Sequence, residues 1–265
     1  MLRLSVNELS TYSWTFEEDV LHYHSQGFDA IGIWRPKLAD YGEEKGLELL
    51  HEQGLSISSL QWIGGFTGSE GRSYRDSLHD GFDTIQLAAD IGAETVVVLA
   101  GGRGGHTTNH ARRILRNALT DLSEAAQAVG VQLAVEPLHA GCSAEWSFLN
   151  TIPDCLEVIA EIDNPHLGIV FDCYHLAQDR GVIAALPTIV PYVRLVQLGD
   201  ARHAPLGEQN RCLLGHGRIP LAKLISCFQE FGYNGYYEIE VAGRDVEHLR
   251  YEQILGQARK VTALW

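Results

Sequence analysis

The sequence predicts an α/β fold of the (β/α)8-barrel (TIM barrel) type, formed as a single domain by residues 1–265. Its 265 residues are close to the roughly 250 typical of such a barrel. Short β-rich runs alternate eight times with longer helical patterns, and no linker or composition break interrupts them. Eight parallel strands joined by helical crossovers close into a barrel, with a doubly wound open sheet as the alternative.

The expected strands are short runs rich in Val, Ile and Leu, bounded by turn residues. In chain order they are Leu2–Val6, Ala30–Trp34, Ser56–Leu60, Thr95–Leu99, Val131–Glu136, Leu167–Asp172, Val193–Leu198 and Tyr236–Val241. The expected helices are Phe16–Gln26, Glu43–Gln53, Asp76–Ile91, Asn109–Val129, Ile152–Glu161, Leu176–Leu186, Leu221–Phe231 and Val246–Leu264.

Glycines stand where expected helices end and the next strand is about to begin. They are Gly27, Gly54, Gly92, Gly130 and Gly232. A helix often ends in a left-handed residue, and glycine adopts that conformation without strain. Their spacing therefore supports the alternation of helix and strand.

Composition, net charge and absent motifs argue against several classes of function. Hydrophobic residues make up 45% and charged residues 20%, as in a globular protein. The formal net charge of −14 disfavours nucleic acid and anionic membranes as partners, because phosphate groups repel such a chain. A GxSxG acyl-hydrolase motif is absent, and no lysine ends an expected strand, as a Schiff-base aldolase would need.

Cysteine usage and the first residues favour a cytoplasmic protein. The five cysteines are odd in number and include no CxxC pair, which disfavours a disulfide framework or a zinc ribbon. The N-terminus lacks the basic and apolar regions of a signal peptide, and no apolar run reaches membrane-spanning length.

Four consecutive expected strands each end in a side chain with an oxygen ligand. These are Glu136, Asp172, Gln197 and Glu240. In a barrel the active site lies at the carboxyl ends of the strands, so these side chains are expected to meet. Three carboxylates and an amide oxygen are a set that Mg²⁺ or Mn²⁺ prefers, so we expect one divalent metal ion, with Zn²⁺ or Co²⁺ as alternatives.

Each of these residues also has an ordinary structural interpretation. Asp172 could cap the following helix, Gln197 could bond a loop backbone, and His175 could be a satisfied first-turn histidine. Glu238 faces the same side as Glu240 and is an alternative ligand, but it lies one layer deeper. The matching positions on four strands favour the metal site.

The chain resembles the xylose-isomerase-like sugar isomerase/epimerase superfamily, which includes inosose isomerases, ketose 3-epimerases and hydroxypyruvate isomerases. The motifs that carry the resemblance are Leu133-Ala-Val-Glu136-Pro137-Leu-His139, Val170-Phe-Asp172-Cys-Tyr-His175, Val196-Gln197-Leu-Gly-Asp200-Ala, Gly215-His-Gly-Arg-Ile-Pro220, Gly232-Tyr-Asn-Gly235 and Tyr237-Glu-Ile-Glu240-Val. Many members have a metal-binding histidine where this chain has Gln197, whereas hydroxypyruvate isomerases and some 3-dehydroshikimate dehydratases resemble it in having glutamine.

The resemblance implies a metal-dependent isomerase or epimerase of a small keto sugar, inosose or hydroxy-keto acid, acting through an enediolate. It implies that Glu136 and Glu240 are the catalytic pair, and that His175 contacts substrate or the metal-bound oxygen. Arg202 and His203 would bind a distal substrate group or form a solvated loop pair.

The resemblance leaves other activities open. The main alternative is a lyase of the 3-dehydroshikimate dehydratase type; an endonuclease IV-like or non-catalytic sugar-binding barrel fits less well. A small sugar-like molecule is the expected partner, and a homo-oligomer is left open.

Overall fold

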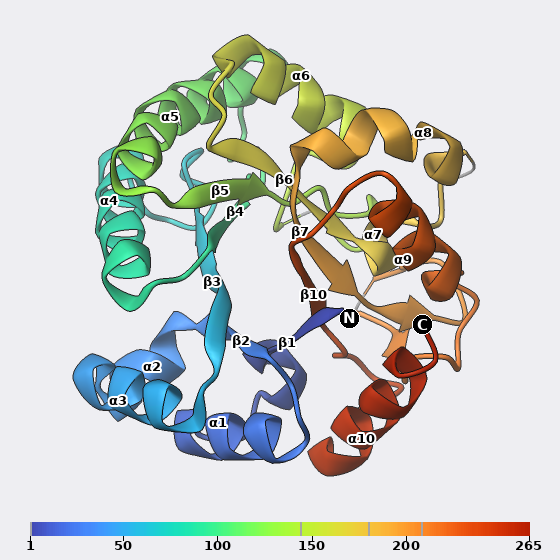
Figure 1. Ribbon diagram of the computed structural model, residues 1–265. Coiled ribbons are helices and arrows are strands. Elements are labelled where there is room, and N and C mark those ends of the chain that lie inside the picture. Colours follow the sequence, from blue (N-terminus) through green and yellow to red (C-terminus); the bar gives the residue numbers. More distant parts are fainter. Residues whose placement is uncertain (1, 144, 180, 208) are drawn as a thin grey trace.

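The computed structural model describes residues 2–143, 145–179, 181–207 and 209–265. Eight parallel strands close into a barrel in the order β1-β10-β7-β6-β5-β4-β3-β2. Helices surround this barrel on its outside, and the first and last strands lie side by side (Figure 1). The predicted (β/α)8 architecture is confirmed.

The barrel strands match the expected runs closely. They are β1 Arg3–Asn7, β2 Ala30–Trp34, β3 Ser56–Gly64, β4 Thr95–Leu99, β5 Gln132–Val135, β6 Leu167–Asp172, β7 Val193–Leu198 and β10 Tyr236–Ile239. The α-helices are α1 Phe16–Ser25, α2 Arg35–Tyr41, α3 Glu43–Gln53, α4 Tyr74–Ile91, α5 Thr108–Val129, α6 Ile152–Ile162, α7 Cys173–Leu176, α8 Val182–Ile189, α9 Leu221–Glu230 and α10 Tyr251–Thr262. Two 3-10 turns are η1 Glu8–Thr11 and η2 Val190–Tyr192.

The five glycines that punctuate the expected helices all have positive φ angles, between 68° and 88°. Gly54, Gly92 and Gly130 are themselves the helix caps. This confirms the turn chemistry on which the alternation of helix and strand was based.

The connection after β6 differs from the expected single helix over Leu176–Leu186. The structure has two helices there, α7 and α8, and Gly181 begins the second with a φ of 97°. Helix α7 starts early because the Asp172 side chain caps it, accepting from the backbone N–H of Tyr174 at 2.7 Å. Arg180, within the expected helix, lies outside the described residues.

Other departures are smaller in extent. Helix α2 was not expected, and its proline near the N-terminus is compatible with a first helical turn. Helix α10 begins at Tyr251 rather than Val246. The connection after β7 contains a short antiparallel pair, β8 Asp200–Ala201 and β9 Arg211–Cys212.

Two apolar layers result from the alternation of side chains along the strands. In β4, Val96 and Val98 belong to the large core beneath the helices, whereas Val97 belongs to a small separate cluster. That cluster takes one residue from each of six barrel strands and fills the barrel interior: Ala30, Val97, Ala134, Val170, Leu195 and Tyr236. It is the floor on which the polar residues of the barrel mouth rest.

In the part of the chain that the structure describes, no helix is both long and apolar enough to cross a membrane.

Candidate active site

A cavity of about 430 Å³ opens at the carboxyl ends of the barrel strands. Its lining combines two acids with four uncharged polar side chains and a largely apolar wall. The lining residues are Leu9, Gln61, Trp62, Leu99, Glu136, Leu138, Cys142, Trp146, His175, Gly207, Gln209 and Glu240.

The strand register explains why polar side chains gather here. Ala134, Val170 and Leu195 form part of the interior floor, and side chains two residues later point the same way. Those next inward positions are Glu136, Asp172 and Gln197. Within the barrel, Gln197 pairs in register with Asp172 on one side and with Glu238 on the other. Glu240 lies one inward step above Glu238.

The predicted carboxylates come close together. Ligand atoms of Glu136, Asp172 and His175 all lie within 4.8 Å of one another. Glu240 joins them through a shared cation: Nη2 of Arg211 lies 2.5 Å from Oδ2 of Asp172 and 2.9 Å from Oε1 of Glu240. The three acids therefore form one buried cluster around a single guanidinium group.

Gln197 presents an unpartnered oxygen beside these acids. Its Nε2 donates to Oε1 of Glu238 at 3.4 Å. Its Oε1 is buried and has no hydrogen-bond partner within the described residues. Buried carbonyl oxygens are rarely left without a partner, so this atom is suited to accept a cation or a donor from a ligand.

Glu238 is held as a structural residue beneath the site. Its carboxylate accepts from Nδ2 of Asn7 at 2.9 Å, Oγ of Ser58 at 2.7 Å and Oγ of Ser59 at 2.6 Å. Burial raises its pKa, while the hydrogen bonds from Ser59 and Ser58 oppose that rise. Gly32 on β2 is required here, because a Cβ atom at that position would collide with the carboxylate.

The carboxyl groups at the cavity have raised pKa values. Burial raises the pKa of Glu240 to about 7, although the nearby charge of Arg211 opposes this. Burial also raises the pKa of Glu136 well above its usual range, and the charges of Glu240 and Asp172 add to the effect. Gathering several acids in a dehydrated site has this electrostatic cost, which a bound cation would remove.

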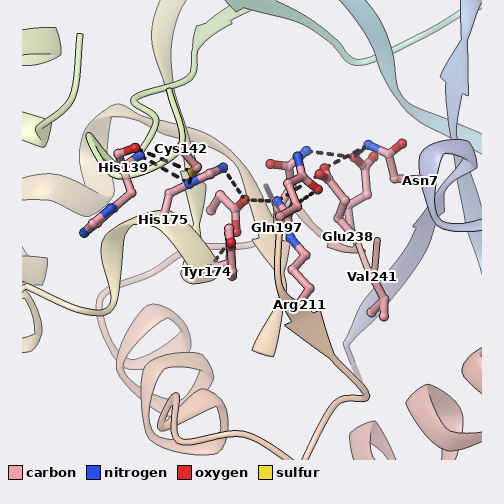
Figure 2. A network of polar contacts seen from close by, with 12 residues as sticks. Asn7, His139, Cys142, Tyr174, His175, Gln197, Arg211, Glu238 and Val241 are labelled. Atoms are coloured by element: carbon pink, nitrogen blue, oxygen red, sulfur yellow. Dashed lines mark hydrogen bonds and ion pairs between the residues drawn. The ribbon is translucent and has the colours of Figure 1, made fainter. Parts of the chain in front are cut away.

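His175 extends the polar network away from the acids. Its Nδ1 accepts from the backbone N–H of His139 at 3.2 Å, and its Nε2 lies 3.6 Å from Oδ2 of Asp172. Burial lowers its pKa to about 4, so the ring is neutral, and because Nδ1 accepts a hydrogen bond the proton lies on Nε2. Figure 2 shows these contacts running from Asn7 and Glu238 at one side to His139 and Cys142 at the other.

Comparison with known proteins establishes the family. The family described as "Xylose isomerase-like TIM barrel" matches residues 22–262. This chain belongs to it. An inosose isomerase of Halalkalibacterium halodurans is 23% identical, over 98% of this chain and 95% of that protein.

Two crystal structures resemble this family member closely in fold. Protein SMc04130 from Sinorhizobium meliloti 1021 has a TM-score of 0.89 at 24% identity, covering 99% of this chain and 98% of its own. The IOLI protein with a bound zinc atom has a TM-score of 0.83 at 21% identity, covering 99% of this chain and 97% of its own.

Arg211 is the site residue that the sequence analysis missed. It is fully buried, its Nη1 donates to Oε1 of Gln209 at 2.5 Å, and its guanidinium carbon lies 4.3 Å from the centroid of the Tyr174 ring. Gly199 leaves room for it, since a Cβ atom there would lie 2.9 Å from Nε of Arg211. The available signal was an arginine at the start of an apolar run, Arg211-Cys-Leu-Leu214, within a long polar loop.

Arg202 and His203 are not brought to the cavity of this xylose isomerase-like barrel. Both are exposed, and Nη1 of Arg202 lies 3.3 Å from Oδ2 of Asp245. They directly follow β8, where the chain turns outward before β9 returns it to the site. The hairpin thus delivers Arg211, rather than these two residues, to the acids.

The donor set at the mouth fits a divalent cation. Glu136, Asp172 and Glu240 offer carboxylate oxygens, and Gln197 offers the unpartnered amide oxygen described above. Hard divalent ions favour oxygen ligands of this kind, and several buried acids near one cation provide the negative potential to attract them.

Proposed function

We propose that this protein is a divalent-metal-dependent isomerase or epimerase that moves a proton next to the carbonyl group of a small sugar-like compound. The main observation behind this proposal is the buried cluster of Glu136, Asp172 and Glu240 at a cavity, beside the unpartnered oxygen of Gln197. Similarity to an inosose isomerase along nearly the whole chain supports the same reaction type.

Glu136, Asp172, Gln197 and Glu240 would hold the metal ion. A donor set made only of oxygen favours Mn²⁺ or Mg²⁺, whereas the zinc in the similar IOLI structure keeps Zn²⁺ as an alternative alongside Co²⁺. When bound, such an ion supplies Lewis-acid stabilisation of negative charge on a substrate oxygen.

Glu136 and Glu240 are the proposed proton-transfer pair. Both carboxyl groups line the cavity, and they come from separate strand ends. Two acids on opposite sides of a substrate carbon let one remove a proton while the other returns one. Because a bound divalent ion lowers the pKa of a carboxyl group, the acid that takes up the proton would have to turn away from the ion.

Arg211 and His175 provide hydrogen-bond donors around this pair. Arg211 holds Asp172 and Glu240 in place through its shared Nη2 atom. The neutral His175 ring directs its Nε2–H toward Asp172 and the cavity that it lines. Donors fixed in advance by packing stabilise developing oxyanion charge without reorganisation.

The test is exchange of the substrate α-proton with solvent in D2O, followed by NMR. Purified protein is first treated with chelator and then given Mn²⁺ or Mg²⁺, with an inosose or a ketohexose as substrate. We expect exchange that depends on added metal and is lost in Glu136→Gln. Metal-loaded protein that exchanges no ketose, inosose or hydroxy-keto acid would refute the proposal. Ultraviolet absorbance from a conjugated product would indicate a dehydratase instead.

A further inference from the structure

We propose that the cavity selects an uncharged polyhydroxy ketone and discriminates against substrates that carry a carboxylate or phosphate group. In this arrangement Trp62 and Trp146 contact the hydrocarbon face of the substrate. The inference rests on the function proposed above, because it concerns the same cavity.

The first argument is the charge of the cavity lining. Among the described residues that line it, none is Lys or Arg, while Glu136 and Glu240 are acids. The remaining polar side chains are the amides Gln61 and Gln209, the thiol of Cys142 and the imidazole of His175. An anionic substrate group that enters the cavity would lose water without gaining a cationic partner from the lining, which is costly.

The nearest buried cation is already engaged. Arg211 divides its terminal nitrogens between Asp172, Glu240 and Gln209. Its single charge and the two charges of a divalent ion balance the three proposed carboxylate ligands. The ion, Arg211 and the three acids together therefore carry no net positive charge that would attract an anion.

A second arginine lies behind the aromatic wall and is also engaged. Arg35 contacts Asp80 through both terminal nitrogens, at 3.0 and 3.1 Å, and donates to the backbone oxygen of Trp62 at 2.9 Å. Release of this guanidinium would break a bidentate ion pair and the bond that supports Trp62. It is therefore part of the wall and not a free anion-binding group.

The second argument is the aromatic wall itself. The rings of Trp62 and Trp146 meet edge to face, with centroids 5.8 Å apart and planes at 80°. Leu9, Leu99 and Leu138 continue the apolar surface. Such a wall suits the C–H groups of a sugar or cyclitol ring, leaving its hydroxyl groups for the amides and the acid side.

The experiment compares four compounds with the same Mn²⁺-loaded protein, measuring kcat/KM for α-proton exchange. An inosose and a ketohexose are uncharged, whereas hydroxypyruvate and 3-dehydroshikimate are anionic. We expect the better uncharged compound to exceed both anions by roughly 100-fold. Equal or faster exchange of an anion overturns this inference and leaves the proposed function intact. Exchange of none of the four overturns the proposed function, and this inference with it.

A pair of variants tests the charge argument directly. Trp146 is 49% exposed at the rim, so its replacement leaves the core intact. Trp146→Arg adds a cation, and Trp146→Gln is the matched uncharged control. We expect Trp146→Arg to exchange the anionic compounds roughly tenfold faster than Trp146→Gln does, with both variants weaker than the parent on the uncharged pair. Equal rates of anion exchange in the two variants would overturn the inference.

Discussion

Two groups of acids are buried in this barrel, each around a cation of its own. The two groups differ in what lies beside them. The site cluster consists of Glu136, Asp172, Arg211 and Glu240, and two of its acids line the cavity. The Lys37 cluster consists of Glu8, Asp19 and Lys37 with Thr11 and Tyr23. It lies where η1, α1 and α2 pack together, and none of these five residues lines the cavity.

Protein donors satisfy most of the Lys37 cluster, although Oε1 of Glu8 is buried without a hydrogen-bond partner among the described residues. Nζ of Lys37 lies 2.5 Å from Oδ2 of Asp19 and donates to the backbone oxygen of Thr11 at 3.0 Å. Oγ1 of Thr11 donates to Oδ1 of Asp19 at 2.6 Å, and Oε2 of Glu8 accepts from the backbone N–H of Trp34 at 2.7 Å. These contacts fasten the first βα connection to the barrel.

The site cluster places two acids, Glu136 and Glu240, at the cavity, and the unpartnered amide oxygen of Gln197 lies beside the cluster. Burial raises carboxyl pKa values in both clusters, so the electrostatic cost of gathering acids does not by itself distinguish them. The comparison teaches that a buried charged cluster alone does not mark a functional site. An acid excess beside an accessible cavity does.

The largest expected effect comes from the site cluster. Glu240→Gln keeps the shape of the side chain and removes its charge, so proton exchange should fall by roughly 10³-fold or more. Its folding should be retained, because the loss of a buried acid also relieves repulsion within the cluster. Steady-state exchange in D2O and circular dichroism provide the two measurements. If the variant retains most of its activity, Glu240 is not a proton-transfer residue.

The opposite pattern is expected for the Lys37 cluster. Lys37→Met leaves Asp19 buried without its cation, which should cost about 3–5 kcal/mol of unfolding free energy. The kcat of the protein that remains folded should change little. Urea unfolding measures the loss, and the double variant Lys37→Met/Asp19→Asn should recover part of it. A lower kcat with unchanged stability would mean that the Lys37 cluster takes part in catalysis, so that the two clusters would not differ in role.

A pH test isolates the contribution of Glu8 in the Lys37 cluster. Burial raises the pKa of Glu8 well above its usual range, and the charge of Asp19 adds to this. Between the unfolded and the raised folded pKa, the folded state keeps a proton that the unfolded chain has released. Stability therefore falls as pH rises through that window, by up to about 1.4 kcal/mol per pH unit.

Glu8→Gln should remove this contribution. Calorimetry from about pH 5 to 8 should show the Tm of the variant rising relative to the Tm of the parent protein as pH increases. A Tm difference that stays constant, or a variant that loses Tm relative to the parent as pH rises, would mean that Glu8 is ionised in the folded protein.

A smaller effect is expected on metal preference at Gln197, beside the site cluster. Gln197→His replaces an oxygen donor with a ring nitrogen, which Zn²⁺ and Co²⁺ favour over Mn²⁺. The ratio of Zn²⁺ to Mn²⁺ affinity should rise by about tenfold, as measured by competition calorimetry. Gln197→Asn is the control, because it retains an oxygen donor. An unchanged ratio would argue against Gln197 as a ligand.

The fold and the strand-end acids could be predicted because both follow from local periodicity. Side chains alternate along a strand, so an acid two residues after an interior residue must face the mouth, as Glu136 does after Ala134. Arg211 could not be found this way. It sits in a two-residue strand within a long connection, and its position depends on the space at Gly199 and the ring of Tyr174.

The smallest expected effect is at Arg202. The family resemblance suggested this residue for substrate binding, but it does not line the cavity. Arg202→Ala removes an exposed guanidinium whose partner Asp245 is also solvent-accessible. Exposed ion pairs contribute little, so both stability and kcat/KM should be nearly unchanged. Arg211→Ala is the informative contrast, since it strips the site cluster of its cation a few residues further along the same hairpin. A large loss of kcat/KM in Arg202→Ala, with KM raised and Tm constant, would mean that the loop closes over bound substrate and brings Arg202 to it.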